Sequence, residues 1–257
     1  MQSYIHRENS NELIECIPNT DKISKCLMFG AFMTSNYEWG KNAIQAGIRF
    51  DKRSISTSEY GIVGDEGYFE ALDKQFESFN FALGYKTSLT EKITTRFNLA
   101  SGFRAPNLSE LTSNGVHEGS NRYEIGNPNL NNEQNFQIDL ALEYKNEHLE
   151  LFANGFYNIV NDYIFLSPNG DVIDDTDVYL YLQDDAKLYG GEIGFHLHPH
   201  PLDWLHFESS FETVTGKQNN NDSYLPLIPA NSLNNTVRVE YNTKWLDKGY
   251  AFIKLNS

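Results

Sequence analysis

The sequence predicts an all-β fold, an antiparallel up-and-down transmembrane β-barrel segment of about ten strands. Three observations predict it. Apolar and polar residues alternate with a period of two over long segments, which is typical of strands with one apolar face. Short turns alternate with long polar loops along the chain, as they do in outer-membrane barrels. Aromatic residues make up 14% of the 257 residues, a composition that suits strands and argues against disorder.

The alternation is clearest over residues 93–103. Ile93, Phe97 and Phe103 fall on one face of this strand, and Arg96 and Asn98 fall on the other. The same pattern recurs over residues 79–86, 136–144, 192–198 and 205–212. We expect the apolar face to contact lipid through Phe97, Leu99, Leu140, Leu142, Phe195 and Phe207.

Turn residues divide the chain into ten expected strands. They cover residues 24–37, 42–55, 76–88, 92–104, 132–145, 148–165, 179–198, 203–215, 231–245 and 249–257. Long loops are expected at 56–75, 105–131, 166–178 and 216–230. Most of these strands exceed the 9–11 residues or so that a tilted strand needs to cross a bilayer.

All three tryptophans, Trp39, Trp204 and Trp245, fall at short turns. Tryptophan gathers at membrane interfaces, so we expect the short turns on the periplasmic side and the long loops outside. Ten strands in an open sheet would leave residues 24–37 and 249–257 as unpaired edges. We therefore expect the chain to be a fragment of a larger barrel.

The formal charge of −15 argues against a nucleic-acid partner, which requires a basic surface. The sequence contains no run of about 18 apolar residues, so it predicts no transmembrane helix. The N-terminus lacks the pattern of a signal peptide. The two cysteines, Cys16 and Cys26, are expected to be unpaired thiols, although the periplasm would permit a disulfide.

An ordered set of motifs follows the fourth expected strand. Gly102-Phe103-Arg104-Ala105-Pro106 leads to Glu110-Leu111, and after a loop Gly126-Asn127-Pro128 opens the next strand. This set resembles the barrel of TonB-dependent receptors, in which a GFRAPxLxEL segment precedes a GNPxLxxE segment. Further matches include Gly190-Gly191-Glu192 and Leu225-Pro226, and residues 116–119 resemble the version in Bacteroidota-type bacteria.

The resemblance implies a barrel of about 22 strands around a plug, located in the outer membrane of a Gram-negative bacterium. It implies import of a scarce nutrient, expected to be a metal chelate such as a siderophore, haem or cobalamin, with no cofactor. Residues 1–257 would be a partial barrel domain without the plug. The expected partners are outer-membrane lipid, the TonB complex acting through the missing plug, and the small-molecule substrate.

The long loop at residues 105–131 is the expected substrate vestibule, because long loops on rigid scaffolds often carry function. The tentative ligand-binding residues are His117, Glu118, Arg122 and Tyr123, which either contact the ligand or fix the loop. Arg104 and Glu110 are expected to pair at the barrel mouth. The simpler interpretation is that the motif only holds the rim.

A second group of residues is a weak candidate for a metal site. His196, His198, His206 and Glu208 fall on the same face of two adjacent strands, and imidazole suits zinc, copper and iron. The simpler interpretation is a polar wall inside the barrel. An acidic cluster from Asp171 to Asp177 lacks the spacing of a calcium loop and is expected to be solvated.

Two other functions remain open from the sequence. An outer-membrane enzyme barrel, such as a protease or lipase, would suit the strand number. However, we find no nucleophile elbow or other catalytic motif, and we expect the protein not to be an enzyme. A soluble β-rich binding protein is the third possibility, and extraction into water without detergent would distinguish it.

Overall fold

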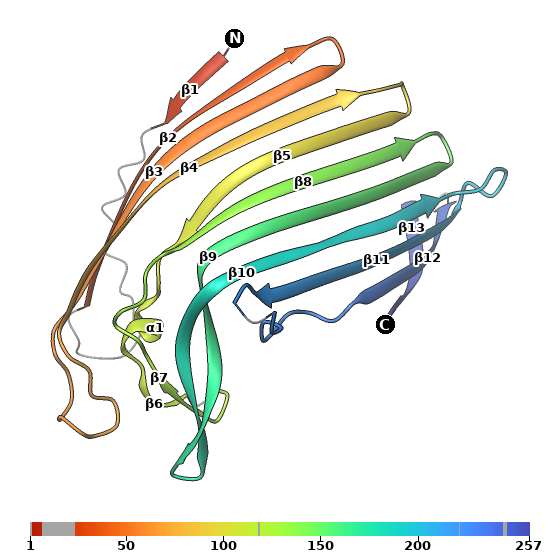
Figure 1. Ribbon diagram of the computed structural model, residues 1–257. Coiled ribbons are helices and arrows are strands. Elements are labelled where there is room, and N and C mark those ends of the chain that lie inside the picture. The colour runs from red at the N-terminus through yellow and green to blue at the C-terminus, as the bar shows by residue number, and fades with distance from the viewer. Residues whose placement is uncertain (1, 7–23, 118, 221, 244–245) are drawn as a thin grey trace.

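The computed structural model describes residues 2–6, 24–117, 119–220, 222–243 and 246–257. They form 13 strands of one sheet and a single short helix. Long neighbouring strands run side by side, with hairpin turns at one end and larger loops at the other (Figure 1). No helix among the described residues has the length and apolar character to span a membrane.

All ten expected strands are present. They are β2 Ser24–Trp39, β3 Asn42–Thr57, β4 Leu72–Ser88, β5 Ile93–Arg104, β8 Glu133–Lys145, β9 Leu149–Ile173, β10 Thr176–Leu197, β11 Leu205–Gln218, β12 Ser232–Thr243 and β13 Leu246–Asn256. Each pairs with its neighbour in an antiparallel arrangement. The additional elements are β1 Gln2–His6, α1 Leu108–Thr112, β6 Asn114–His117 and β7 Arg122–Ile125.

Three expectations about this sheet were wrong. The segment 166–178 is not a loop, because β9 and β10 continue their ladder and leave only Asp174 and Asp175 between them. Pairing is not antiparallel throughout, because β7 pairs in parallel with β10. Strand β2 is not an edge, because β1 pairs along it.

The register confirms that the six predicted lipid-facing residues share one face. Phe97 lies opposite Leu140, and the ladder carries this face across Gly155 and Leu151 to Phe195 and Phe207. Five of the six side chains are exposed and Leu99 is half-buried. We name this the apolar face, and we name the opposite one the polar face.

The polar face carries buried, hydrogen-bonded groups. Asp51 accepts hydrogen bonds at 2.7 Å from Arg49, and Asn80 approaches the same carboxylate at 3.5 Å. The Ser78 hydroxyl donates to Gln134 at 2.7 Å. Buried polar groups require such partners, and their position on one face gives the sheet the two-sided character of a barrel wall.

The hydrophobic core forms where the loop after β5 folds back onto the polar face. Its members are Cys26, Ile55, Leu72, Phe76, Ala105, Leu108, Leu111, Leu130 and Ile164. Burying one leucine or isoleucine side chain stabilises by about 1.5–3 kcal/mol, so this cluster fixes α1 to the sheet. Cys26 is a free, buried thiol, as expected, whereas Cys16 lies outside the described residues.

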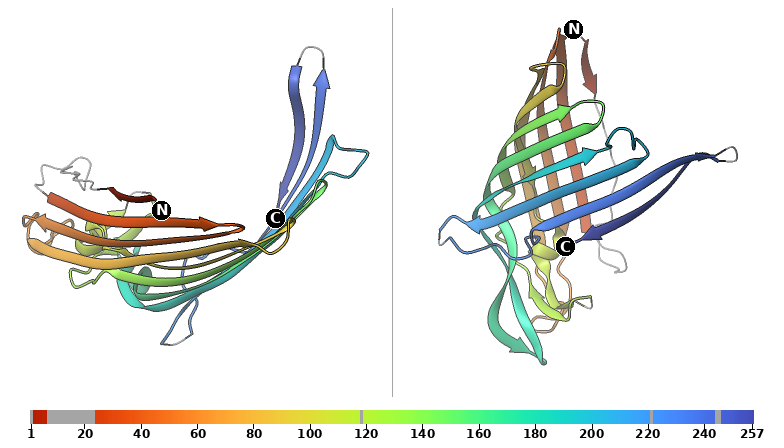
Figure 2. Two further views of the ribbon diagram at one scale, coloured as in Figure 1. Left: turned by 90° about the horizontal axis from the view of Figure 1, so that it is seen from above. Right: turned by 90° about the vertical axis from the view of Figure 1, so that its right-hand side faces the viewer.

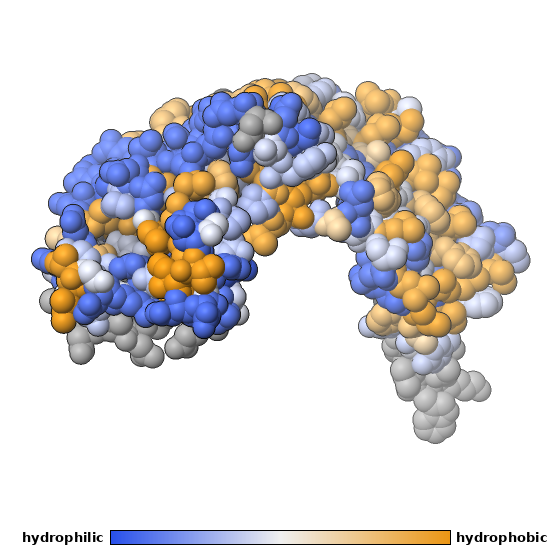
Figure 3. All heavy atoms as spheres, turned by 60° about the horizontal axis from the view of Figure 1, so that its bottom comes forward, coloured by the Kyte–Doolittle hydropathy of each residue, from blue (hydrophilic) through white to orange (hydrophobic). Residues whose placement is uncertain are grey.

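The sheet is curved, and its two ends, β1 and β13, are not paired with each other in the described strands. Figure 2 shows this open trough, with α1 inside the curve. Figure 3 shows an arch with a hollow open side, and apolar side chains gather over the limb of C-terminal strands. Trp39 and Trp204 lie at turns, as expected; Trp245 lies outside the described residues.

Candidate functional site

The loop after β5 begins with an ion-pair clamp on Arg104. The Arg104 guanidinium donates from Nε and Nη2 to both carboxylate oxygens of Glu133, at 2.9 and 2.6 Å. Its Nη1 donates to Glu110 at 2.8 Å, which confirms the expected pair. Both carboxylates are largely buried. Bidentate contacts of this kind fix direction as well as charge, so the clamp sets where the loop leaves the sheet.

Helix α1 is fixed by a capping box. The Asn107 side chain accepts a hydrogen bond from the Glu110 backbone at 2.8 Å, and the Glu110 carboxylate accepts from the Asn107 backbone at the same distance. Reciprocal caps satisfy donors that a helix start leaves free. Leu108 and Leu111 are buried in the core, and Pro106 beside them is also fully buried.

The second motif closes the loop against α1. Gly126 donates its backbone hydrogen bond to Ser113 at 2.7 Å, and Asn127 donates to the Glu110 carbonyl at 2.8 Å. A Cβ at Gly126 would lie 2.6 Å from the backbone nitrogens of Thr112 and Ser113. Only glycine permits this approach, and Pro128 follows directly. The motif residues from Gly102 to Pro128 therefore build the loop.

Between the motifs, β6 and β7 form a small hairpin. Tyr123 is buried, and its hydroxyl donates to Asn114 at 2.9 Å. Burial, together with the charges of Glu66 and Asp174, raises the pKa of Tyr123, so the phenol remains a donor at neutral pH. This hydrogen bond ties Tyr123 of β7 to Asn114 of β6.

The other tentative ligand-binding residues differ in exposure. Arg122 is half-buried and its guanidinium lies 5.2 Å from the centre of the Tyr179 ring, a cation–π contact. His117 is exposed and has one ring nitrogen 3.5 Å from the Ser120 hydroxyl. Glu118 lies outside the described residues. The structure therefore brings His117 and Arg122 to one hairpin, opposite each other in register.

Loop 58–71 interlocks with this hairpin. The Glu66 carboxylate accepts a hydrogen bond from the Val116 backbone at 2.9 Å, and the Asn114 amide donates to the carbonyls of Asp65 and Tyr68 at 3.3 and 3.2 Å. On the other side, Tyr181 donates to Glu124 at 2.8 Å. Sequence reasoning missed these contacts because they join loops far apart in the chain. We call this assembly of residues 58–71 and 104–133 the rim.

A small cavity of about 250 Å³ opens beside the clamp, lined by Arg104, Glu133, Tyr163 and their neighbours on β8–β10. Two amide oxygens that face this region, on Asn135 and Asn158, are buried without a hydrogen-bond partner. Unpartnered buried acceptors of this kind are uncommon in proteins. Neither asparagine was among the residues predicted from sequence.

The opposite end of the polar face gathers the histidines. Ligand nitrogens of His196, His198 and His206 all lie within 4.8 Å of one another, so three of the four weak metal candidates come together, and Glu208 is not part of this group. His196 Nε2 lies 2.9 Å from His206 Nδ1 and 4.0 Å from Glu208. We call His196, His198 and His206 the histidine cluster.

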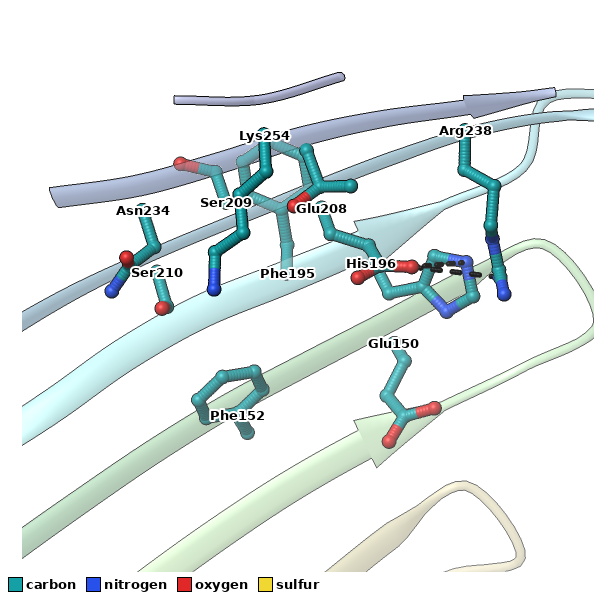
Figure 4. Close-up of a pocket in the computed structure, with 11 residues that line it drawn as sticks. Glu150, Phe152, Phe195, His196, Glu208, Ser209, Ser210, Asn234, Arg238 and Lys254 are labelled. Carbon is teal, nitrogen blue, oxygen red and sulfur yellow. Dashed lines mark ion pairs between the residues drawn. The ribbon is translucent and has the colours of Figure 1, made fainter. Parts of the chain in front are cut away.

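His196 of the histidine cluster lines a groove of about 460 Å³ on the polar face. Figure 4 shows His196, Glu208 and Arg238 converging there, and Glu150 of β9 also lines the groove. Arg238 lies 3.5 Å from Glu208 and 3.5 Å from Glu240, so two carboxylates offset its charge. By contrast, the acidic segment at Asp171–Asp177 contributes to no group of three converging metal ligands in the described part of the chain.

The family model for the β-barrel of TonB-dependent receptor-like proteins matches residues 9–255. The chain belongs to the TonB-dependent receptor barrel family. This agrees with the motif resemblance, and the family consists of outer-membrane receptors and transporters of Gram-negative bacteria.

Solved structures of TonB-dependent receptors have the same fold. The copper transporter OprC has a TM-score of 0.72 at 19% identity, over 85% of this chain and 33% of that one. The hemophore receptor HasR from Serratia marcescens, in complex with its hemophore HasA and heme, has a TM-score of 0.63 at 12% identity, over 85% and 42%. The FrpB iron transporter from Neisseria meningitidis has a TM-score of 0.60 at 11% identity, over 86% of this chain and 31% of that one. The chain thus spans about a third to two fifths of their lengths.

Proposed function

We propose that this chain is part of the barrel of an outer-membrane receptor that imports a scarce nutrient, a metal chelate such as a siderophore, haem or cobalamin. One observation carries the proposal. A folded loop assembly, the rim, covers one end of the polar face, while the opposite face bears exposed apolar side chains across the strands. An aqueous lumen on one side and lipid on the other would require this division.

In the proposed orientation, the rim is the extracellular vestibule and the short turns lie on the periplasmic side. Trp39 supports this orientation, since its ring stacks between Tyr37 and Tyr85 at the turn end, as in an interfacial aromatic belt. Residues 1–257 are then a partial barrel domain. The energy-coupling TonB complex would act through a plug domain that these residues do not include.

His117 and Arg122 are the proposed ligand contacts at the vestibule. They lie opposite each other on β6 and β7, next to the interlocked loops. A guanidinium offers five donors in a planar fork, which suits the carboxylates of haem or the anionic groups of a ferric chelate. Tyr123 holds the hairpin in place, and Glu118 is proposed with His117 on sequence grounds alone.

Uptake by living cells tests the proposal. Strains with and without the gene are each supplied with a radiolabelled ferric siderophore, haem or cobalamin, in the presence and absence of a protonophore. We expect uptake of one of these classes to depend on the gene and to stop with the protonophore. Arg122→Ala should lower affinity at least fivefold, whereas Tyr224→Ala, in another loop, should not. Gene-independent uptake of all three classes would contradict the proposal, and protease activity would favour the enzyme alternative.

A further inference from the structure

Five of the seven histidines lie at the turn end of the polar face. They come from two hairpins of the sheet: His148 lies between β8 and β9, and the other four lie at or near the connection of β10 to β11, where His196 ends β10, His198 and His200 follow it, and His206 begins β11. Neighbouring ring centres are 5.1–5.6 Å apart along this series. Alternation alone places residues on a face, but it does not bring imidazoles from separate hairpins into contact.

The spacing within the histidine cluster is close to that of a metal site. Two nitrogens bound to one tetrahedral ion at about 2.0–2.1 Å lie about 3.4 Å apart. His196 Nε2 and His206 Nδ1 are 2.9 Å apart, and the three ligand nitrogens fit within 4.8 Å. Shifts of about half an ångström at these two rings would admit an ion between them.

The cluster also leaves a nitrogen atom without a partner. His198 Nδ1 is buried and makes no hydrogen bond, although buried polar atoms almost always have one; His206 Nε2 makes none either, but the Glu240 carboxylate lies 3.5 Å from it. His206 as a whole is only 8% exposed. A structural wall of histidines would be expected to satisfy His198 Nδ1, whereas a metal site would use His198 as a ligand.

Two carboxylates lie beside the cluster. Glu208 lies 4.0 Å from His196 Nε2 but is not part of the group of three converging ligands, so its carboxylate would have to move closer to act as a fourth ligand. Glu240 lies 3.5 Å from His206 Nε2. If Nδ1 of His206 binds the metal, Glu240 is placed to orient the imidazole through its other nitrogen, as carboxylates do in known metal sites. Arg238 is the only arginine or lysine in ion-pair contact with these carboxylates among the described residues, and Glu208 and Glu240 together exceed its charge.

We propose that His196, His198 and His206, with Glu208, bind a divalent transition-metal ion of the class that prefers imidazole, Zn²⁺ or Cu²⁺. Magnesium and calcium, which prefer oxygen ligands, are excluded by this ligand set. On the orientation proposed above, which rests on the proposed function, the site lies on the inner wall at the periplasmic end. It is therefore distinct from the vestibule, where incoming substrate is first met.

Direct metal binding tests this proposal without transport. The outer-membrane protein that contains this chain is purified in detergent, stripped with a chelator and titrated with Zn²⁺ by calorimetry, while Co²⁺ substitution reports geometry by absorption. We expect one ion per chain at micromolar affinity or better, a four-coordinate Co²⁺ spectrum and no binding of Mg²⁺. His196→Ala and His198→Ala should each weaken binding at least tenfold, and Glu240→Gln about tenfold.

Two control variants distinguish ligands from bystanders. Ser210→Ala alters the same groove, and His200→Ala removes an exposed histidine of the same turn that lies outside the proposed set. Both should bind Zn²⁺ as the unmodified protein does. The proposal is overturned if Zn²⁺ does not bind, or if His196→Ala and His198→Ala bind like the controls while all variants show the same heat-modifiable gel migration. Loss of uptake alone would concern the proposed function and would leave this site standing.

Discussion

The two ends of the polar face hold an arginine between carboxylates in different ways. At the rim, Arg104 makes hydrogen bonds of 2.6–2.9 Å to Glu110 and Glu133. At the turn end, Arg238 lies 3.5 Å from Glu208 and Glu240, beyond ordinary hydrogen-bond distance. The rim end is thus held by short hydrogen bonds, whereas the arginine of the turn end is held only by longer ion pairs. The clamp therefore fixes the shape of the rim more firmly than Arg238 fixes the turn end.

Both ends depend on the membrane-facing span between them, and a charge placed there should have the largest effect. Leu140→Arg puts a guanidinium on the apolar face beside Phe97, which should cost about 2–4 kcal/mol near the bilayer midplane. Asn154→Arg, on the polar face of the adjacent strand, should cost much less. Urea unfolding in lipid vesicles measures the difference. Equal losses in the two variants would show that we have assigned the faces wrongly.

The arginines themselves give the next largest effect. Arg104→Ala leaves two largely buried carboxylates without their donor, and should destabilise the rim by about 2–3 kcal/mol. Arg238→Ala loses only longer and more exposed contacts, so we expect less than about 1 kcal/mol. Protease digestion of the rim and thermal unfolding compare the two variants. If Arg238→Ala is the more damaging change, the contrast between a tightly held and a loosely held arginine fails.

Two glycine substitutions test how tightly the rim is packed. We expect the one that creates a steric clash to destabilise the rim by about 1–3 kcal/mol. Gly126→Ala would place a Cβ 2.6 Å from backbone nitrogens at the end of α1, which cannot move aside cheaply. Gly155→Ala, in the middle of β9, meets nothing closer than 3.9 Å. We expect Gly126→Ala to loosen the rim, as hydrogen exchange of α1 would report, and Gly155→Ala to leave it unchanged. Equal exchange in both variants would contradict the tight docking.

The sequence predicted the strands well where one face is apolar, because a period of two is a local signal. It failed where backbone pairing continues without that signal. The extension of β9 and β10 past residue 166 contains Asn169, Gly170 and Asp171, which favour a turn by composition. The parallel contact of β7 with β10 depends on how α1 docks, and no local pattern encodes it.

The two candidate sites were predictable to different degrees. Alternation placed His196, His198 and His206 on one face, and the structure confirms that they meet. It could not reveal His148 or Glu240, since their approach depends on the register between separate hairpins. At the rim, the motif resemblance identified Arg104 with Glu110, but the contact of Glu66 with Val116 joins residues 50 apart and leaves no trace in the sequence.

The smallest predicted effect concerns a single hydroxyl at the rim. Tyr123→Phe removes the donor to Asn114 but keeps the buried ring, so the loss should be about 0.5–1.5 kcal/mol. Asn114 retains its bonds to Asp65 and Tyr68, which limits the effect to this one contact. Tyr224→Phe, at an exposed position outside the rim, should change nothing.

The pH dependence of this variant separates the hydroxyl from general loosening. Because burial raises the pKa of Tyr123 above its ordinary value of 10.0, the folded rim holds the phenolic proton more tightly than the unfolded chain does. The stability that the protonated Tyr123 phenol contributes to the folded rim is complete below pH 10 and is lost as the pH rises through the raised pKa. Hydrogen exchange of β6 and β7 should therefore accelerate above about pH 10 in the unmodified protein and less steeply in Tyr123→Phe. An identical slope in both proteins would show that another group controls the opening of the rim.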